Sequence, residues 1–510
     1  MKKYFLILSA LLFLFVHNSC SERDLDLFPP DKDEIDAVNT EAKLQQLLNG
    51  SYLTMASSNV FGTEVMLFGD LMGDKLFVSN SNSSYLNTYN FNYNGGQNDF
   101  GFYGSLYDAI MKCNIVINST KVPASSNLTR IKGEAKILRA FAYFTLVNYY
   151  SPTPTSGINQ EYGVPLVLDD YEVNIQPARA TVAQVYDQII KDLKDGAVQA
   201  DASALNPATN ASSKVRFTQT AAKLLLSRVY LTRRAPGDAE LALQYATEIV
   251  NNSNASFAKI DALAPTIPKD LNNPDAPFDL TPKYVSYFSG AKEEFAEGQP
   301  ETIWELDLNN NTNLVTGIGS NISLPCYYNR TDSRKCLLFN QAFYQSFPAT
   351  DVRRGSPSTG LLTSLGVPVQ DNPRGYWTNK YPRFTQEGNY FRNIKVLRFA
   401  EAQLNRIEAL HLTGQNALAL TELNEFAASR GGSTYTGTNL LNDILTEKAK
   451  EFYGEGQRFL DLKRYNLPVV KTSNCTVNCN IPANDKLFVL PIDQTVLNAN
   501  ANLTQYPGYN

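Results

Sequence analysis

The sequence LTRIKGEAKILRAFAYFTLVNYY, residues 128–150, decides the fold class of this chain. Its apolar residues recur at three- and four-residue steps, as in Ile131, Ala135 and Leu138, which is the period of an amphipathic helix. A second apolar line, which includes Phe141, widens the apolar face. A helix that is apolar over so broad an arc packs against neighbours on more than one side. The pattern therefore predicts a central helix.

The stretch 217–251 predicts two helices joined by a turn. The segment TQTAAKLLLSRVYLTRR is followed by a break at Ala235-Pro236-Gly237, and DAELALQYATEIV then begins with Asp238 as its expected N-cap. The same order returns as VLRFAEAQLNRIEALHL, a Thr-Gly break and QNALALTELNEFAASR. A helix, a short turn and a second helix within about 34 residues form the tetratricopeptide unit. Further helices are expected over 41–57, 102–119, 181–199 and 439–453.

Two other segments lack a helical period. Residues 255–386 are rich in Pro, Gly, Asn and Thr with only short apolar runs, so loops and short strands should dominate there. Residues 80–101 form a second loop, rich in Tyr and Asn. Both lie between helical segments and are interpreted as excursions from one scaffold. The predicted fold class is mainly α: a tetratricopeptide-like α-solenoid scaffold with a loop-rich, mostly irregular region that carries short strands.

The N-terminus carries a targeting signal. Two lysines precede an apolar run over 4–16, and the small residue Ser19 stands directly before Cys20. This pattern predicts a lipoprotein signal peptide over 1–19, with Cys20 as the lipidated anchor. His17 stands where such signals usually have Leu, so ordinary signal-peptidase cleavage stays an alternative.

The rest of the chain is predicted to be a short tether and one large domain. The polar, acidic segment 20–36 looks like a flexible, lipidated tether, and 37–510 should form a single domain. We expect a helical scaffold over 37–254 and 394–465, a loop-rich ligand-binding part over about 255–393, and an extended C-terminal segment over 466–510.

Composition restricts the classes of function. The chain has 45 Lys plus Arg against 50 Asp plus Glu and no long basic stretch, so nucleic acid is not an expected partner. There is no P-loop, dinucleotide fingerprint or HExxH motif, and no cofactor or metal is expected. Once residues 1–19 are removed, His411 is the one histidine left, which restricts nucleophilic triads. A glycosidase-type carboxylate pair stays open as an alternative.

The cysteine spacing suggests two local disulfides in an oxidising compartment. Cys326 and Cys336 would form one bridge, and Cys475 and Cys479 the other. Metal binding is the rival interpretation for the second pair, but no further His or Cys stands nearby to complete a tetrahedral site. Cys113 is expected to be a buried thiol.

Several motifs, in order along nearly the whole chain, resemble the SusD/RagB-like outer-membrane nutrient-binding lipoproteins. They are GDLMGDK (69–75), FYGSLYDAIMKCN (102–114), GEAKILRAFAYFTLVNYY (133–150), YGVPLVL (162–168), RATVAQVYDQIIKDL (179–193), VLRFAEAQLNRIEAL (396–410), EFYGEGQRFLDLKRY (451–465), LPIDQ and QYPGY. The chain departs from the family pattern in Glu447-Lys448, in the terminal Gln505-Tyr506-Pro507-Gly508 and in an insertion over 151–160.

The resemblance implies a function. Such a protein is anchored at the outer-membrane surface through its N-terminal lipid alone, and it captures an oligosaccharide or oligopeptide. It delivers this ligand to a SusC-like, TonB-dependent transporter, without chemistry on the ligand. The alternatives are a secreted surface hydrolase that acts on glycans through a carboxylate pair, and a structural or adhesive surface lipoprotein.

The resemblance also implies where the ligand binds, on loops over 74–94 and 309–330. We expect the Tyr-bearing part of the first loop, over 85–93, to be mobile, and burial of each ring under a loop is the alternative for every aromatic candidate. The charged motif residues among apolar helix positions are instead expected to form a paired scaffold network. The candidate ligand contacts are Asp74, Tyr85, Tyr89, Tyr93, Tyr327, Tyr328, Tyr376 and Trp377, and the expected network residues are Arg139, Arg398, Glu401, Glu408, Glu455, Arg458, Asp461 and Arg464.

Overall fold

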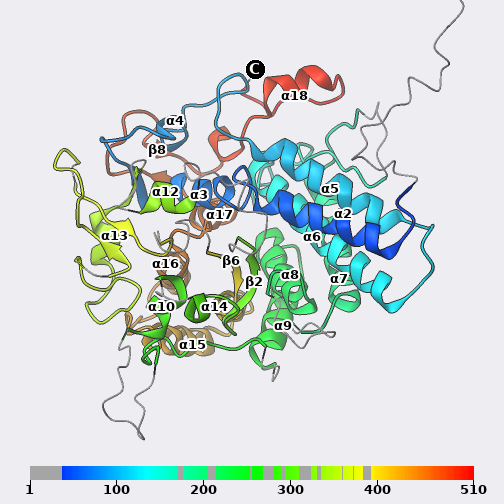
Figure 1. Cartoon of the computed structure of the whole chain (residues 1–510). Helices are drawn as coiled ribbons and strands as arrows, with labels where there is room; N and C mark the ends of the chain where they lie inside the picture. Colours follow the sequence, from blue (N-terminus) through cyan, green and yellow to red (C-terminus); the bar gives the residue numbers. More distant parts are fainter. Residues whose placement is uncertain are drawn as a thin grey trace, which may run out of the picture.

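The structure is a computed structural model of the whole chain (Figure 1). It describes residues 37–169, 176–203, 214–252, 256–267, 281–289, 293–308, 323–329, 335–358, 360–371, 373–382 and 392–509. The predicted signal peptide, the tether and Cys20 lie outside the described residues, as does most of the expected ligand loop over 309–330. Over the described residues, none of the helices has the length and apolar character that a bilayer crossing requires.

The first half of the scaffold is a series of helices that pack side by side (Figure 1). Each long helix packs against the next long one along the chain, and the last of them packs against the first helix of the second half. The helices of the first half are α2 (Glu41–Ala56), α5 (Phe102–Asn118), α6 (Ser126–Tyr150), α7 (Val182–Gln199), α8 (Gln219–Arg233) and α9 (Asp238–Val250), and those of the second half are α14 (Phe399–Leu412), α15 (Asn416–Ala428), α16 (Leu440–Phe452) and α17 (Arg458–Arg464). The predicted mainly helical, tetratricopeptide-like fold is confirmed.

The helix α6 is central, as its two apolar lines predict. It begins after Ser125, whose hydroxyl caps it by accepting a hydrogen bond from the Leu128 amide at 2.9 Å. Every residue from Ala140 to Tyr150 is buried. Helices α2, α5, α7 and α8 all contact α6. Its broad apolar surface is therefore covered on several sides.

The start of α9 differs from the prediction. Gly237 is the N-cap, in the left-handed region at φ 85°, and Asp238 is the first helical residue. The carboxylate of Asp238 instead accepts a hydrogen bond from the Ala235 amide at 2.8 Å and pairs with Arg233. Asp238 thus fastens the turn between α8 and α9 rather than the helix end.

Short strands occur in the loop-rich part, as predicted, and also in other connecting segments, and they form separate antiparallel pairs. Between them lie short helices. The strand pairs are β1 (Leu76–Val78) with β3 (Leu337–Phe339), β2 (Thr302–Leu306) with β6 (Ile394–Arg398), β4 (Leu362–Thr363) with β5 (Trp377–Thr378), and β7 (Val469–Val470) with β8 (Asn480–Ile481). The short α-helices are α3 (Glu64–Leu71), α4 (Leu86–Tyr89), α10 (Lys283–Ser289), α11 (Glu293–Ala296), α12 (Leu324–Tyr328), α13 (Gln341–Gln345) and α18 (Gln494–Ala499).

Two sequence motifs far apart in the chain meet backbone to backbone. Gly69 in α3 lies so close to Gly456 that a Cβ on Gly69 would stand 1.9 Å from the Gly456 carbonyl oxygen. The neighbouring Asp70 carboxylate accepts a hydrogen bond from the Gly456 amide at 2.8 Å. Only glycine allows this approach, and it fixes α3 against the turn that precedes α17.

The expected scaffold network of charged residues is confirmed. Arg139 binds Asp192 at 2.8 Å, Arg398 binds Glu451 at 2.9 Å, and Lys448 binds Glu408 at 2.6 Å, all in the interior. Burial alone would raise the pKa of Glu408, but Arg464 and Lys448 hold it well below its usual range. The remaining pairs of the predicted set are Arg228–Glu401, Lys380–Glu455, Arg398–Glu455, Arg458–Asp74, Arg464–Glu408 and Arg464–Asp461.

Candidate functional site

The ladder of β1 and β3 has two ends, and most of the first expected ligand loop follows β1 at one of them. Val78 pairs with Leu337 at this end, and Leu76 pairs with Phe339 at the other. From Val78 the chain runs through a polar turn into α4, and α12 lies next to it (Figure 1). We call this the α4–α12 surface, made of residues 79–89 and 323–329.

Tyr85 is the aromatic residue of the first loop that reaches the α4–α12 surface. It is half-buried and stands before α4 with φ 59°, a left-handed conformation that is strained for an aromatic residue. Its ring packs edge-on against Phe68 and Tyr327, with ring centroids 5.3 and 5.2 Å apart. The Tyr85 hydroxyl donates a hydrogen bond to the Tyr327 hydroxyl at 3.4 Å. These contacts fix the ring while one part stays open to solvent.

Polar groups in the turn that precedes Tyr85 are held in place by Asp371. Its carboxylate accepts hydrogen bonds from the Ser79 hydroxyl and the Asn80 amide, both at 2.7 Å, and from the Asn474 side chain at 3.1 Å. Asp371 is buried, whereas Asn80 and Ser81 are exposed. Asp371 is not predicted from the sequence, because a lone Asp in a Pro-rich loop carries no motif that would single it out.

Tyr89 and Tyr93 are core residues, so the prediction of a mobile, Tyr-bearing loop over 85–93 is wrong for them. Both are at most 7% exposed. The Tyr89 hydroxyl donates to the Ser473 carbonyl oxygen, and the Tyr93 hydroxyl donates to the Leu487 carbonyl oxygen at 2.6 Å. The cause is the C-terminal segment, which returns across this loop and covers the rings.

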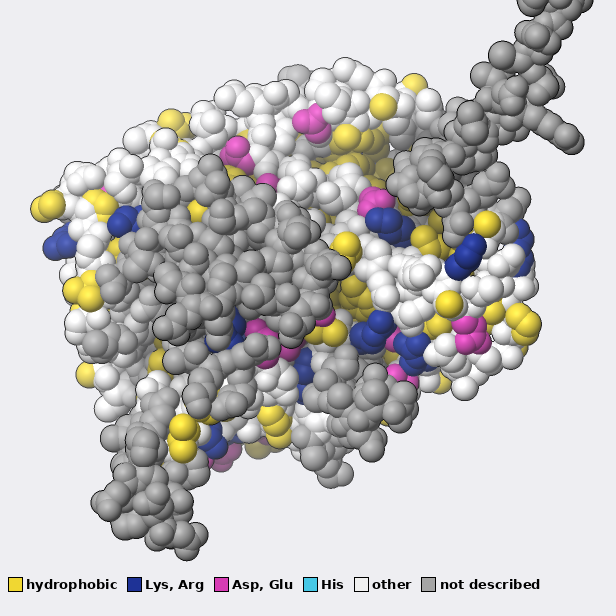
Figure 2. Space-filling view, in the orientation of Figure 1, with side chains coloured by type: hydrophobic (Ala, Val, Ile, Leu, Met, Phe, Trp, Pro, Cys, Tyr) yellow, Lys and Arg dark blue, Asp and Glu magenta, His cyan; other side chains and the backbone are white. Residues whose placement is uncertain are grey.

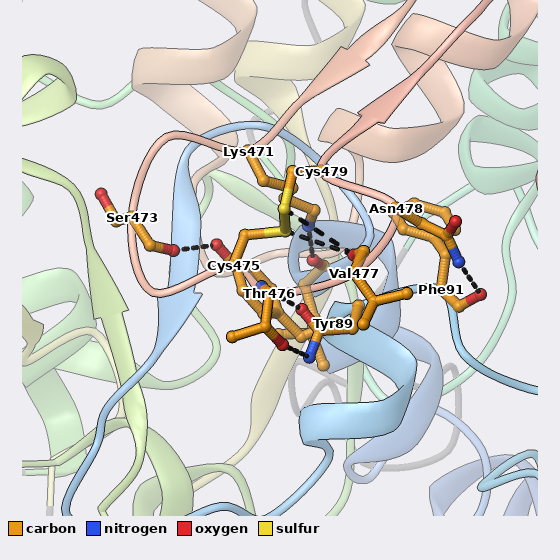
Figure 3. Close-up of a disulfide and its surroundings, with 11 residues drawn as sticks. Tyr89, Phe91, Lys471, Ser473, Cys475, Thr476, Val477, Asn478 and Cys479 are labelled. Atoms are coloured by element: carbon orange, nitrogen blue, oxygen red, sulfur yellow. Dashed lines mark hydrogen bonds between the residues drawn. A yellow bond between two sulfur atoms is a disulfide. The ribbon is translucent and has the colours of Figure 1, made fainter.

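The predicted Cys475–Cys479 disulfide is present and closes the hairpin tip that covers α4 (Figure 3). Thr476 in this tip exchanges hydrogen bonds with Asn90, both at 3.3 Å. The Lys471 amine lies 4.3 Å from the centroid of the Tyr89 ring. The disulfide therefore belongs to the structure that covers the first loop.

The second predicted disulfide is not formed. Cys326 and Cys336 are both buried thiols, the first in α12 and the second just before β3. The Cys336 amide donates to the Tyr327 carbonyl oxygen at 3.1 Å, so backbone bonding already joins the two segments. Burial raises the pKa of the Cys336 thiol. Cys113, predicted to be a buried thiol, is one.

Of the other aromatic candidates, only Tyr327 is described in contact with Tyr85, and it is itself buried. Tyr327, Tyr328 and Trp377 are at most 3% exposed, so they are core residues. Tyr376 is half-buried, but its backbone pairs with Phe339 at the opposite end of the ladder. There its ring stacks on Tyr344 with centroids 3.8 Å apart.

Asp74 also lies at that opposite end and is already bound within the protein. The Arg458 guanidinium donates two hydrogen bonds to it, at 2.7 and 2.9 Å, and Lys75 adds a third at 3.0 Å. Asp74 is therefore not part of the α4–α12 surface. No group of three or more His, Cys, Asp or Glu side chains suited to a metal ion occurs in the described part of the chain.

Two family models match the chain. The model described as "Starch-binding associating with outer membrane" matches residues 25–231, and the model of the SusD family matches residues 358–509. The chain belongs to the SusD/RagB family.

A full-length relative and a partial one support this membership. The chain is 25% identical to SusD-like protein P2 of Formosa agariphila over the full length of both chains. A SusD-like protein of Bacteroides ovatus is 29% identical over 31% of this chain and 28% of its own length.

Solved structures of the SusD superfamily share the fold. One from Bacteroides vulgatus, 23% identical, has a TM-score of 0.75 and covers 92% of this chain and 100% of its own. The surface glycan-binding protein A of Bacteroides uniformis, 20% identical, has a TM-score of 0.69 with coverage of 92% and 100%.

Proposed function

We propose that this protein is a cell-surface glycan-binding lipoprotein that captures an oligosaccharide and delivers it to a SusC-like, TonB-dependent transporter in the outer membrane. The observation that carries the proposal is the family membership, which rests on models at both ends of the chain and on a full-length relative. The description "Starch-binding associating with outer membrane" of the first model supports a glycan ligand at that membrane.

The α4–α12 surface supports the proposal through its chemistry. Sugar rings present apolar C–H faces to an aromatic ring and hydroxyl groups to amides and hydroxyls. Tyr85 supplies a fixed, half-buried ring, and the exposed Asn80 and Ser81 supply polar groups in the turn that precedes it. The oligopeptide ligand of the sequence analysis has no comparable support in the names of the relatives, so we favour the oligosaccharide.

We further propose that the protein binds its ligand without catalysis. His411 lies in the last turn of α14 and its imidazole bonds the Asn416 side chain at 2.8 Å, so it takes the structural role that its position suggests. The acidic motif residues Glu401, Glu408 and Glu455 are held in ion pairs with cations of the scaffold. Acids in such pairs are poor candidates for the proton donor of a glycosidase.

Anchoring and partnership complete the proposal. Cys20 would carry the lipid, and segment 20–36 would act as a leash between the membrane and the folded domain. On the face shown in Figure 2, Lys and Arg side chains are interspersed with Asp and Glu instead of forming one basic field. This distribution favours a protein partner and a neutral ligand over nucleic acid.

The test of the ligand is a panel of neutral oligosaccharides, measured by calorimetry on the purified domain. Binding to at least one glycan is expected, and Tyr85→Ala should weaken it about tenfold, because a lost ring contact is worth on the order of 1 kcal/mol. Tyr376→Ala is the matched control, since Tyr376 is a half-buried tyrosine at the other end of the ladder. If no glycan binds, or if both variants bind like the wild type, the proposed ligand class or the proposed surface is wrong.

A further inference from the structure

A cavity of about 430 Å³ opens at the end of the β1–β3 ladder that is remote from the α4–α12 surface. The residues before β1 and after β3 form its floor, and α13, α16 and the segment around β7 form its walls. Its volume falls within the range of small-molecule sites, about 300–1,000 Å³. Asp74, Lys75 and Arg458 are among the residues that line it.

The floor of this cavity carries two cations and one carboxylate. Asp74 receives the Nε and Nη2 donors of Arg458 and one hydrogen bond from the Lys75 amine. Burial alone would raise the pKa of Asp74, but Arg458 and Lys75 hold it well below its usual range. Asp74 therefore stays ionised at physiological pH, and the floor has a net charge of about +1.

Both cations keep donors to spare. The Nη1 group of Arg458 makes no hydrogen bond to any described residue, and the Lys75 amine makes only the one to Asp74. The Lys75 side chain is 31% exposed and that of Arg458 is 12% exposed. The hydrogen bonds to Asp74 hold both side chains in place at the cavity. Their unused N–H groups are therefore preorganised, which lowers the entropic cost of binding an anion.

The walls offer contacts for the rest of a small ligand. Phe343, Ala449 and Val470 contribute apolar surface, whereas Ser346 and Thr472 place exposed polar side chains at the cavity. Lys471, which follows Val470, is buried and does not line the cavity, and its burial lowers the pKa of its amine. Its amine instead donates to the Leu71 carbonyl oxygen inside the protein.

We propose that this cavity is a second binding site, which holds the carboxylate of a small acidic ligand between Lys75 and Arg458. The carboxylate matches two fixed cationic donors, which form the stronger, charge-assisted class of hydrogen bond. It can come from two sources, an acidic sugar or the C-terminus of a short peptide. The site shares no residue with the proposed neutral-glycan surface.

The test is calorimetry at millimolar ligand with glucuronate, glucose, an N-acetylated dipeptide and the same dipeptide as its amide. Glucuronate binding without glucose binding supports the site and assigns it to acidic sugars. Dipeptide binding that is lost with the amide supports it and assigns the peptide terminus. Failure of both carboxylates to bind overturns the proposal.

Three variants locate the binding. Lys75→Gln removes the more exposed cation, and Ala342→Trp fills the cavity from the exposed face of α13 without touching a charge. Each should weaken carboxylate binding at least tenfold, while neutral-glycan binding at Tyr85 stays unchanged. Lys112→Gln is the matched control, because the Lys112 side chain is 26% exposed and pairs with Asp108 elsewhere. Carboxylate binding that survives both Lys75→Gln and Ala342→Trp would place the ligand somewhere else and sink the proposal.

Discussion

The buried pair of Arg139 and Asp192 should contribute strongly to the stability of the scaffold. Its side chains are 6% and 0% exposed, and two hydrogen bonds of 2.8 Å join them between α6 and α7. The third nitrogen of Arg139 donates to the Asn114 side chain in α5 at 2.8 Å. One guanidinium thus ties three consecutive helices together.

Replacing Arg139 with Met removes the cation and leaves the carboxylate in the interior. Of the side-chain donors to Asp192, only Gln188 stays, at 3.0 Å. Removing one partner of a buried ion pair costs about 3–5 kcal/mol in the free energy of unfolding. The double variant Arg139→Met with Asp192→Leu should be more stable than Arg139→Met alone, because it removes the stranded charge as well.

Urea unfolding followed by circular dichroism measures these differences through the midpoint and slope. The matched control is Lys136→Met, because Lys136 bonds Asp195 at 2.8 Å across the same α6–α7 interface but with side chains 15% and 36% exposed. A more exposed pair of this kind is worth about 1 kcal/mol or less. The reasoning fails if Arg139→Met costs no more than Lys136→Met, or if the double variant is less stable than the single one.

Three further predictions follow from the fold and the N-terminal signal. Tyr89→Ala and Tyr93→Ala should each destabilise the protein by about 3–5 kcal/mol, since each removes a buried ring. Unfolding midpoints like that of the wild type would show that the rings are not core residues and would make them candidate ligand contacts again. Burial raises the pKa of Glu64 from 4.5 to about 8. The contribution of protonated Glu64 to the stability of the fold is therefore complete below pH 4.5 and is lost as the pH rises through about 8. In Glu64→Gln, the part of the decline in stability between pH 4.5 and 8 that is due to Glu64 should disappear. Identical pH profiles of stability for the wild type and this variant would contradict the assignment. Cys20→Ala should abolish lipid attachment and release the protein from the outer-membrane fraction, which incorporation of labelled fatty acid would disprove.

The helices could be predicted from the sequence because their signals are local. The two apolar lines of 128–150 and the break at Pro236-Gly237 lie within a few turns of the residues that they order. The helix expected over 439–453 also starts where it was predicted, since the side chain of Asn439 caps the start of α16. Local periodicity therefore sufficed for the scaffold.

The candidate site could be predicted only in part, because its geometry depends on contacts between distant segments. Tyr85, Tyr89 and Tyr93 look alike in sequence, and only the C-terminal segment that returns over α4 separates the half-buried ring from the buried ones. Asp371 accepts a hydrogen bond from Ser79, which lies 292 residues away in the sequence, and no local pattern predicts such a contact. Asp74 was expected among the ligand contacts, but its partner Arg458 lies in a motif 384 residues away.

The most direct test of the central claim is uptake of a fluorescent oligosaccharide, chosen from those that the purified domain binds, by cells of the source bacterium. Wild-type cells should bind the label at the surface and import it. Cells that lack the partner transporter should still bind the label through this protein but import none, and cells that lack this protein should lose surface binding. Undiminished import without the transporter, or undiminished surface binding without this protein, would contradict a role in glycan capture and delivery.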